Sequence, residues 1–287
     1  MGFQILKNKI ESVRSTQKLT DAMRMVATAK MRSAQEKMKL SRPYAEKILE
    51  VISHLAKAHQ EYRHPYLIER PKERNVGYII ITTDRGLCGS LNSTLLKKIS
   101  TKIIDSIDKG IGVSLYLVGA KADVFFRSIE GCQITARVCN YGKETRIVGL
   151  LGGIRVMLDS YMEEKIDSLS ICYNRFVNTM TQRPIIQKLI PLVPEEGRRP
   201  YWDYIYEPDS SQLLEPLLER YIESQVYQGL LENHASEQSA RMVAMMGASE
   251  NASRLIDSLT IEYNKARQSQ ITQEIAEIIS GSEAISS

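Results

Sequence analysis

Proline and glycine are scarce toward both ends of this 287-residue chain. Pro43 is the only residue of either type between positions 3 and 57, and only Gly229 and Gly247 occur between Pro216 and position 280. Both residue types break or weaken helices. Their scarcity predicts two long helices, over about 3–57 and 210–280.

Long apolar runs are also missing. No segment approaches the ~18 apolar residues of a membrane-spanning helix, and the opening MGFQILKNKIES lacks the apolar core of a signal peptide. Leu6 stands where a myristoylation signal needs Ser or Thr. The four cysteines form no C-x-x-C pair, so we expect reduced, mostly buried thiols in a cytoplasmic protein; they are Cys88, Cys132, Cys139 and Cys172.

Catalytic and cofactor motifs are absent as well. The four histidines show no metal-ligand spacing, and we expect His54, His59 and His64 at the surface. TDRGLCGSLN (83–92) follows an apolar run and precedes a helix, where glycine-rich loops can bind phosphate, but it matches neither the P-loop nor the dinucleotide fingerprint. A tight turn or interaction loop is favoured over a nucleotide site. We therefore expect no catalytic residue, no metal and no cofactor.

Positive charge is concentrated near the N-terminus. Residues 1–47 contain eleven Lys or Arg and four Asp or Glu, whereas the whole chain has a net charge of only +4. This asymmetry indicates an acidic partner, either protein or nucleic acid. Aromatic platforms for bases are limited to Phe3 and Tyr44 in this stretch.

Each predicted long helix carries a narrow seam of apolar and small residues at alternating spacings of three and four. In the first helix the seam is Ile10, Val13, Gln17, Thr20, Arg24, Ala27, Met31, Ala34, Met38, Ser41, Ala45, Ile48, Ile52 and Leu55; in the second it is Leu231, Ala235, Gln238, Met242, Met245, Ser249, Ala252, Ile256, Leu259, Tyr263 and Ala266. A narrow seam suits one partner helix. An antiparallel coiled coil of the two helices is the simplest arrangement.

The middle of the chain has a different pattern. Apolar, β-rich runs at 75–83, 113–119, 134–140 and 168–178 alternate with predicted helices at about 91–109, 120–129 and 145–163. Strands that alternate with helices predict a mainly parallel sheet. The expected fold is therefore α-rich α+β: a long antiparallel coiled coil (1–60 and 210–287) with an inserted small α/β, Rossmann-like domain at 74–200.

Three stretches give the chain a clear resemblance. IESVRSTQKLTDAMRMVATAKM (10–31), TTDRGLCGSLN (82–92) and SEQSARMVAMMGASENAS…YNKARQSQITQEIAEIISG (236–281) resemble the gamma subunit of bacterial F-type ATP synthase. The resemblance covers nearly the whole chain. It implies a central-stalk rotor with no active site of its own, which couples rotation of a membrane c-ring to ATP synthesis or hydrolysis in other subunits.

The resemblance also assigns contact residues. Met23 is implied where the stalk meets a beta subunit, and its replacement by Lys is expected to uncouple rotation from catalysis. The full set implied for coupling or partner contact is Met23, Arg24, Arg85, Cys88, Arg241, Arg267, Gln268, Thr272 and Glu274. Tyr204, Tyr206 and Glu207 are implied in the foot that faces the c-ring and the epsilon subunit.

The implied partners are three alpha and three beta subunits, the epsilon subunit and the membrane c-ring, without nucleic acid or membrane insertion. The expected location is peripheral, on the cytoplasmic face of the bacterial inner membrane. The sequence starts directly in the first helix, which fits a bacterial protein better than an imported one. A basic coiled-coil protein that binds nucleic acid is the alternative, and it would show steeply salt-dependent binding to duplex.

Overall fold

The computed structural model describes residues 2–58, 64–140, 147–192 and 210–286. They belong to two compact units. The first unit comprises Met1–Ala27 and Arg241–Ser287, and the second comprises Thr28–Ala240. Both long helices, α1 (Gly2–Ala58) and α5 (Ser210–Ser286), contribute to each unit. The predicted domain limits at 60, 74, 200 and 210 remain proposals.

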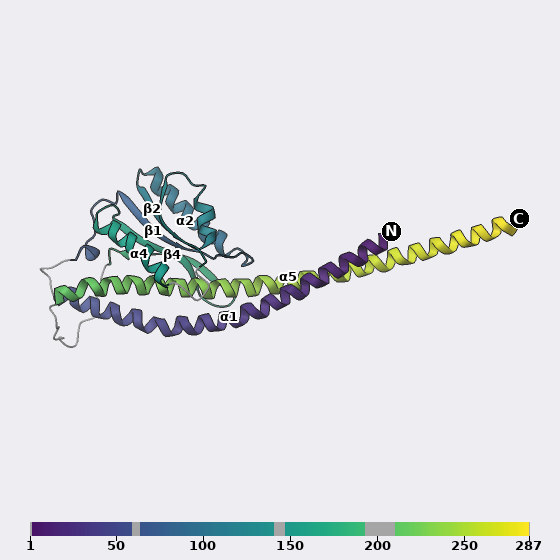
Figure 1. Ribbon diagram of the computed structural model, residues 1–287, viewed down its shortest axis with the longest axis horizontal. Coiled ribbons are helices and arrows are strands. Elements are labelled where there is room, and N and C mark those ends of the chain that lie inside the picture. The colour runs from purple at the N-terminus through teal and green to yellow at the C-terminus, as the bar shows by residue number, and fades with distance from the viewer. Residues whose placement is uncertain (1, 59–63, 141–146, 193–209, 287) are drawn as a thin grey trace. The chain divides into compact units, whose positions relative to one another are not determined.

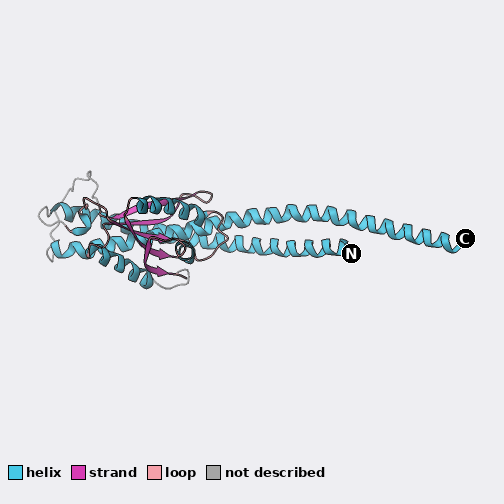
Figure 2. Cartoon of the chain, turned by 90° about the horizontal axis from the view of Figure 1, so that it is seen from above, coloured by secondary structure: helices cyan, strands magenta, loops and turns pink. Residues whose placement is uncertain are grey.

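The coiled-coil seam is confirmed. Every seam residue whose burial is described is buried or half-buried. In α1, and in α5 after residue 249, most of the neighbouring residues are exposed, whereas all residues of α5 from 231 to 245 are buried or half-buried. In the first unit the rings of Phe3 and Tyr263 lie 6.1 Å apart, which pairs the start of α1 with a late turn of α5. In the second unit Ser41 of α1 hydrogen-bonds Gln228 of α5. In each unit, α1 and α5 run side by side in opposite directions (Figures 1 and 2).

The second unit contains a five-stranded sheet in the order β3-β2-β1-β4-β5. The strands are β1 (Asn75–Ile81), β2 (Gly112–Val118), β3 (Cys132–Val138), β4 (Ser168–Phe176) and β5 (Gln182–Ile190). The first four are parallel neighbours, and β5 joins β4 antiparallel. The helices between them are α2 (Leu91–Asp108), α3 (Ala120–Phe126) and α4 (Ile147–Met162). The expected mainly parallel α/β unit is confirmed.

Alternating strand residues build two separate cores, one on each face of the sheet. One core joins Tyr78, Ile80 and Leu115 to apolar residues of α2 and α3. The other joins the opposite strand positions to α4, to Ile48 and Ile52 of α1, and to α5 residues 214–226. Figure 1 shows α4 and the adjacent part of α5 on this second side. The α/β domain is therefore packed on the helix pair within the second unit.

The buried stretch of α5 is polar where it meets β4. Asn174 donates from both its backbone and its side chain to Asn233 Oδ1, at 3.3 and 3.1 Å. One turn later, Ser236 Oγ donates to the Asn174 carbonyl at 2.9 Å, and Ser239 Oγ donates to the Thr179 carbonyl at 2.6 Å. These bonds satisfy polar groups that burial would otherwise leave unpaired. They give α5 a defined register on the sheet.

Some sequence predictions were wrong or incomplete. β5 was not expected as a strand, and a short 3-10 helix at Pro65–Leu67 was also missed. His64, expected at the surface, is 1% exposed, because its ring packs on Tyr66 beside that 3-10 helix. His54 and His59 lie among residues whose side chains are not described.

None of the four cysteines forms a disulfide; Cys88 and Cys172 are buried, Cys132 is half-buried and Cys139 is exposed. None of the helices in the described ranges is long and apolar enough to cross a membrane.

Candidate partner-contact surfaces

The first predicted contact region lies in the first unit, on facing helices. Met23 and Arg24 of α1 are half-buried, and Arg241 of α5 is also half-buried. Arg24 Nε lies 3.5 Å from an Asp21 carboxylate oxygen, and both side chains are more than a third exposed. Such a solvent-exposed pair contributes only ~0–1 kcal/mol. It can therefore be exchanged for contacts with another protein at little cost.

Exposed apolar residues surround Met23, and the sequence reading did not single them out. Leu19 is 61% exposed and Val26 is 54% exposed, and together with Met23 they occupy positions i, i+4 and i+7 of one helical face. Met25, on a neighbouring face, is 62% exposed. The spacing of these apolar residues could have indicated an exposed apolar face. It was overlooked because the longer seam through Thr20 and Ala27 gives the stronger periodic pattern. The surface therefore combines exposed apolar area with the partly exposed charges of Arg24 and Asp21.

The second predicted contact region is the last part of α5. Arg267, Gln268, Thr272 and Glu274 are all exposed, and the nearby Ile271, Ile275 and Ile278 are 48%, 52% and 71% exposed. The polar side chains bond only locally: Thr272 Oγ1 donates to the Gln268 carbonyl at 2.9 Å, and Gln270 Nε2 donates to Glu274 at 2.9 Å. This tip is a helix with mixed polar and apolar faces, and apolar exposure of this kind marks an interaction surface.

The third predicted region, the loop from 82 to 90 between β1 and α2, is held by its own polar side chains. Asn92 accepts from the Thr83 backbone at 3.2 Å and donates to Thr83 Oγ1 at 2.7 Å and to Cys88 Sγ at 3.3 Å. Asp84 accepts backbone N–H bonds from Ala120 and Asn140, at 3.1 and 2.9 Å. The side chains of Asn92 and Asp84 thus fix the shape of the loop. This geometry agrees with an interaction loop.

Within that loop, the exposed residues differ from the predicted ones in part. Arg85 is exposed, whereas Cys88 is only 2% exposed and receives the Asn92 bond. Leu87 is 62% exposed and has a left-handed backbone with φ of 64°. A non-glycine residue in that region is uncommon. The turn therefore presents Leu87 and Arg85 outward while Cys88 faces inward, and a contact role for either predicted residue remains a prediction.

Tyr204, Tyr206 and Glu207, the implied foot residues, lie outside the described residues. Among the residues that are described, no group of three or more His, Cys, Asp or Glu side chains could hold a metal ion. The candidate contact surfaces contain charged, polar and apolar side chains at helix surfaces and one ordered loop.

Comparison with known proteins gives the family. A family model described as ATP synthase matches residues 3–285. Among solved structures, a chain from the central stalk and c-ring of the Tetrahymena thermophila mitochondrial ATP synthase is 24% identical, with a TM-score of 0.60 over 80% of this chain and 99% of that one.

Two structures from the Euglena gracilis mitochondrial ATP synthase are also similar. A chain of its rotor is 18% identical with a TM-score of 0.60, over 94% of this chain and 99% of that one. A chain of its OSCP, F1 and c-ring assembly is 19% identical with a TM-score of 0.66, over 99% and 94%. These structural similarities show a shared fold, and the match to the family model shows which family the chain belongs to. The chain belongs to the ATP synthase gamma-subunit family, whose members are non-catalytic parts of that complex.

Proposed function

We propose that this chain is the central rotor of a bacterial ATP synthase and couples ion-driven rotation of a c-ring to catalysis at alpha and beta subunits. The observation that carries the proposal is the exposed tip of α5, in a chain that belongs to the gamma-subunit family. A lone helix with isoleucines about half exposed needs a surrounding partner. Three alpha and three beta subunits would supply it as a sleeve.

The mechanism follows from asymmetry. The two helices present different side chains around their circumference, so each beta subunit would meet a different surface at any one angle. Shaft orientation would then select among site conformations, which is a coupling free energy between rotor angle and nucleotide affinity. Contacts made by exposed charge pairs are each worth only ~0.2–1 kcal/mol. Such contacts can be broken and remade as the rotor turns.

The remaining assignments belong to the same proposal. The chain would sit peripherally on the cytoplasmic face of the inner membrane, with Tyr204, Tyr206 and Glu207 facing the c-ring and the epsilon subunit. The similar mitochondrial structures are those of a central stalk, a rotor and an assembly with a c-ring. A nucleic-acid-binding role has support from none of the comparisons, and the positive charge of residues 1–47 is consistent with acidic surfaces on beta subunits.

The test is reconstitution. The chain is mixed with separately purified alpha and beta subunits, and Mg-ATPase activity is compared with that of each part alone. We expect a stable complex with strongly raised hydrolysis. No association and no stimulation would contradict the rotor function.

Variants at position 23 test the coupling step. In membranes with the complete complex, Met23→Lys should retain ATP hydrolysis but lower ATP-driven ion pumping, because a new charge at this surface strengthens some rotor angles over others. Met23→Leu is the matched control, since it keeps an apolar side chain of similar size, and it should pump normally. Equal pumping by both variants would contradict the role of Met23.

A further inference from the structure

A hollow lies between α2 and the β4–β5 side of the sheet, and it shares no lining residue with the surfaces discussed above. Its volume is about 690 Å³. Ligand pockets for small molecules commonly have volumes of 300–1,000 Å³. The loop from 82 to 90 follows the carboxyl end of β1, whereas this hollow lies over the first half of β1 and β4.

The hollow exists because β4 is small and polar on one face. Leu169 and Ile171 point into the core beneath α4, whereas Ser168 and Ser170 point to the α2 side and line the hollow. Ser170 is paired in register with Tyr78 of β1 and with Lys188 of β5. Three neighbouring strands therefore present a row of two hydroxyls and one ammonium group on the same face, where apolar residues would otherwise fill the space under α2.

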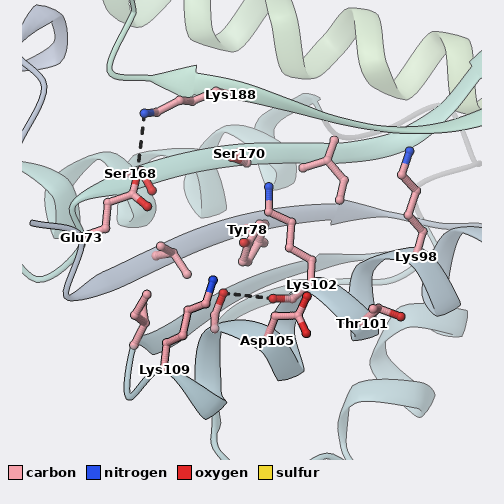
Figure 3. A pocket seen from close by; sticks show the side chains of 14 residues that line it. Glu73, Tyr78, Lys98, Thr101, Lys102, Asp105, Lys109, Ser168, Ser170 and Lys188 are labelled. Carbon is pink, nitrogen blue, oxygen red and sulfur yellow. Dashed lines mark hydrogen bonds and ion pairs between the residues drawn. The ribbon is translucent and has the colours of Figure 1, made fainter.

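Positive charge surrounds this row. Four lysines and two carboxylates line the hollow, a net charge of +2: Lys98, Lys102, Lys109, Lys188, Glu73 and Asp105. Figure 3 shows the side chains of Lys102 and Lys109 directed from α2 and its end toward the sheet, where Tyr78 forms the floor.

Two of these lysines are already engaged. Lys188 Nζ lies 3.7 Å from Glu73, and Lys98 Nζ donates to the Pro184 carbonyl at 2.8 Å. Neither Lys102 nor Lys109 has an ion pair within 4 Å among the residues that the structure describes. Two ammonium groups are thus available to a ligand, on one side of the row of hydroxyls.

The floor of the hollow favours hydrogen bonding to an anion. Burial raises the pKa of the Tyr78 phenol, so its hydroxyl remains a neutral donor at physiological pH. Burial also raises the pKa of Cys172 to about 12, and the charges of Lys102 and Lys98 act in the opposite direction.

We propose that this hollow binds a phosphorylated small molecule that carries at least two negative charges. Lys102 and Lys109 would pair with the phosphate oxygens, since lysine binds phosphate as a point charge. The hydroxyls of Tyr78 and Ser170 would donate hydrogen bonds to the same group. Val76, Ile111 and Ile186 form an apolar wall that would contact an organic part of the ligand.

The alternative interpretation is that these lysines are ordinary solvated side chains on a helix surface and bind no ligand. Two features favour a site. The lysines surround a concave space rather than a convex surface, and the sheet beneath them presents Tyr78, Ser170 and Lys188 in a polar row that crosses three strands.

The test uses the full chain, free of other subunits, and titrates it with pyrophosphate and with ADP by calorimetry at physiological ionic strength. We expect saturable 1:1 binding of at least one probe with Kd below ~1 mM. Tighter binding of ADP would assign the apolar wall to the organic part, and equal binding would indicate that the phosphates alone are recognised. Absence of saturable binding of both probes would overturn the proposal.

Matched variants locate the site. Lys102→Gln with Lys109→Gln should weaken binding at least tenfold, because it removes two charge-assisted contacts. Lys97→Gln with Lys121→Gln is the control; it removes the same charge from exposed lysines of the same domain that do not line the hollow. Equal weakening by both pairs would show diffuse surface attraction and overturn the proposal.

A neutral variant provides an independent readout. Ser170→Leu removes a proposed hydrogen-bond donor and places a larger apolar side chain on the floor of the hollow without changing any charge, and it should also weaken binding at least tenfold. Its melting temperature, measured in parallel, establishes that the protein is folded. A folded Ser170→Leu protein that binds as well as the wild type would overturn the proposal.

Discussion

At the scale of single residues, His64 is buried beside the 3-10 helix at Pro65–Leu67 and bonded to its backbone. Its Nδ1 accepts the Tyr66 backbone N–H at 3.2 Å, and its ring lies 4.7 Å from the Tyr66 ring in an edge arrangement. Burial lowers the pKa of His64, and the charge of Glu215 opposes that shift only partly. Histidine here acts as a neutral cap for a 3-10 helix, a role for which a lone His in a polar stretch gives no sequence signal.

The lowered pKa predicts a pH dependence of stability. Histidine in an unfolded chain has a pKa near 6.5. Below that pH the unfolded state therefore binds a proton at His64 that the folded state does not bind. The free energy of unfolding should therefore fall as pH drops from 7.5 to 5.5. His64→Asn keeps an acceptor for the Tyr66 N–H but cannot titrate in this range.

Urea denaturation of both proteins at several pH values makes the comparison. The wild type should lose more stability than His64→Asn between pH 7.5 and 5.5, since the other histidines are common to both. Parallel pH profiles for the two proteins would contradict a buried, neutral His64.

At the scale of elements, sequence periodicity was sufficient for most of the fold and for its seam. The long helices, the parallel strands and the 3-4 seam all follow from burial that repeats with a fixed period. β5 was missed because QRPIIQKLI contains Pro184 and alternates poorly, although proline is compatible with an edge strand. Of the stretch around Asn233 and Ser236, only Leu231, Ala235 and Gln238 were assigned to a two-helix seam. The stretch is also buried against the sheet, and long-range hydrogen bonds of this kind leave no local pattern.

The candidate contact surfaces were only partly predictable for a similar reason. The exposed tip of α5 could be inferred because its isoleucines continue past the point where a partner helix should end. The outward turn of Leu87 and the inward turn of Cys88 depend on hydrogen bonds from Asn92 to Thr83 and Cys88, and on the bond that Asp84 accepts from the Ala120 backbone. Such hydrogen bonds depend on the three-dimensional fold, and the spacing of residues in the sequence does not predict them.

Close approach of α4 to the sheet gives an element-level prediction. A Cβ on Gly153 would come within 2.7 Å of the Tyr116 hydroxyl and closer still to its ring carbons. Tyr116 is completely buried, and its hydroxyl donates to the Leu150 carbonyl at 3.2 Å, so the ring has no free direction in which to move. Gly153→Ala should lower the free energy of unfolding by about 2 kcal/mol, as overpacking does in other cores.

The neighbouring glycine is the control. Gly152 is exposed on the same helix, and a Cβ there would meet nothing within 4 Å. Gly152→Ala should stabilise the protein by about 0.5–1 kcal/mol, because alanine loses less backbone entropy in a helix. Denaturant midpoints measure both effects. A Gly153→Ala protein as stable as Gly152→Ala would show that α4 is not held tightly against Tyr116.

At the scale of the whole molecule, apolar burial is divided very unevenly between the two units. Both hydrophobic cores lie in the second unit. In the described part of the first unit only four residues are buried, namely Ala27, Met245, Ser249 and Leu259. Helices in proteins gain most of their stability from tertiary packing. The first unit should therefore open far more readily than the sheet, unless a partner covers it.

Hydrogen exchange measures this difference directly. In the isolated chain, amides of residues 4–26 and 250–280 should exchange at least ~100-fold faster than those of β1, β2 and β4, as expected for locally opening segments. Addition of purified alpha and beta subunits should slow exchange in those helical segments and leave the strands unchanged. Equal protection of both units in the isolated chain would mean that the narrow seam between α1 and α5 stabilises the first unit without a partner. Protection of the first unit that does not rise in the complex would place the sleeve elsewhere and contradict the proposed rotor surfaces.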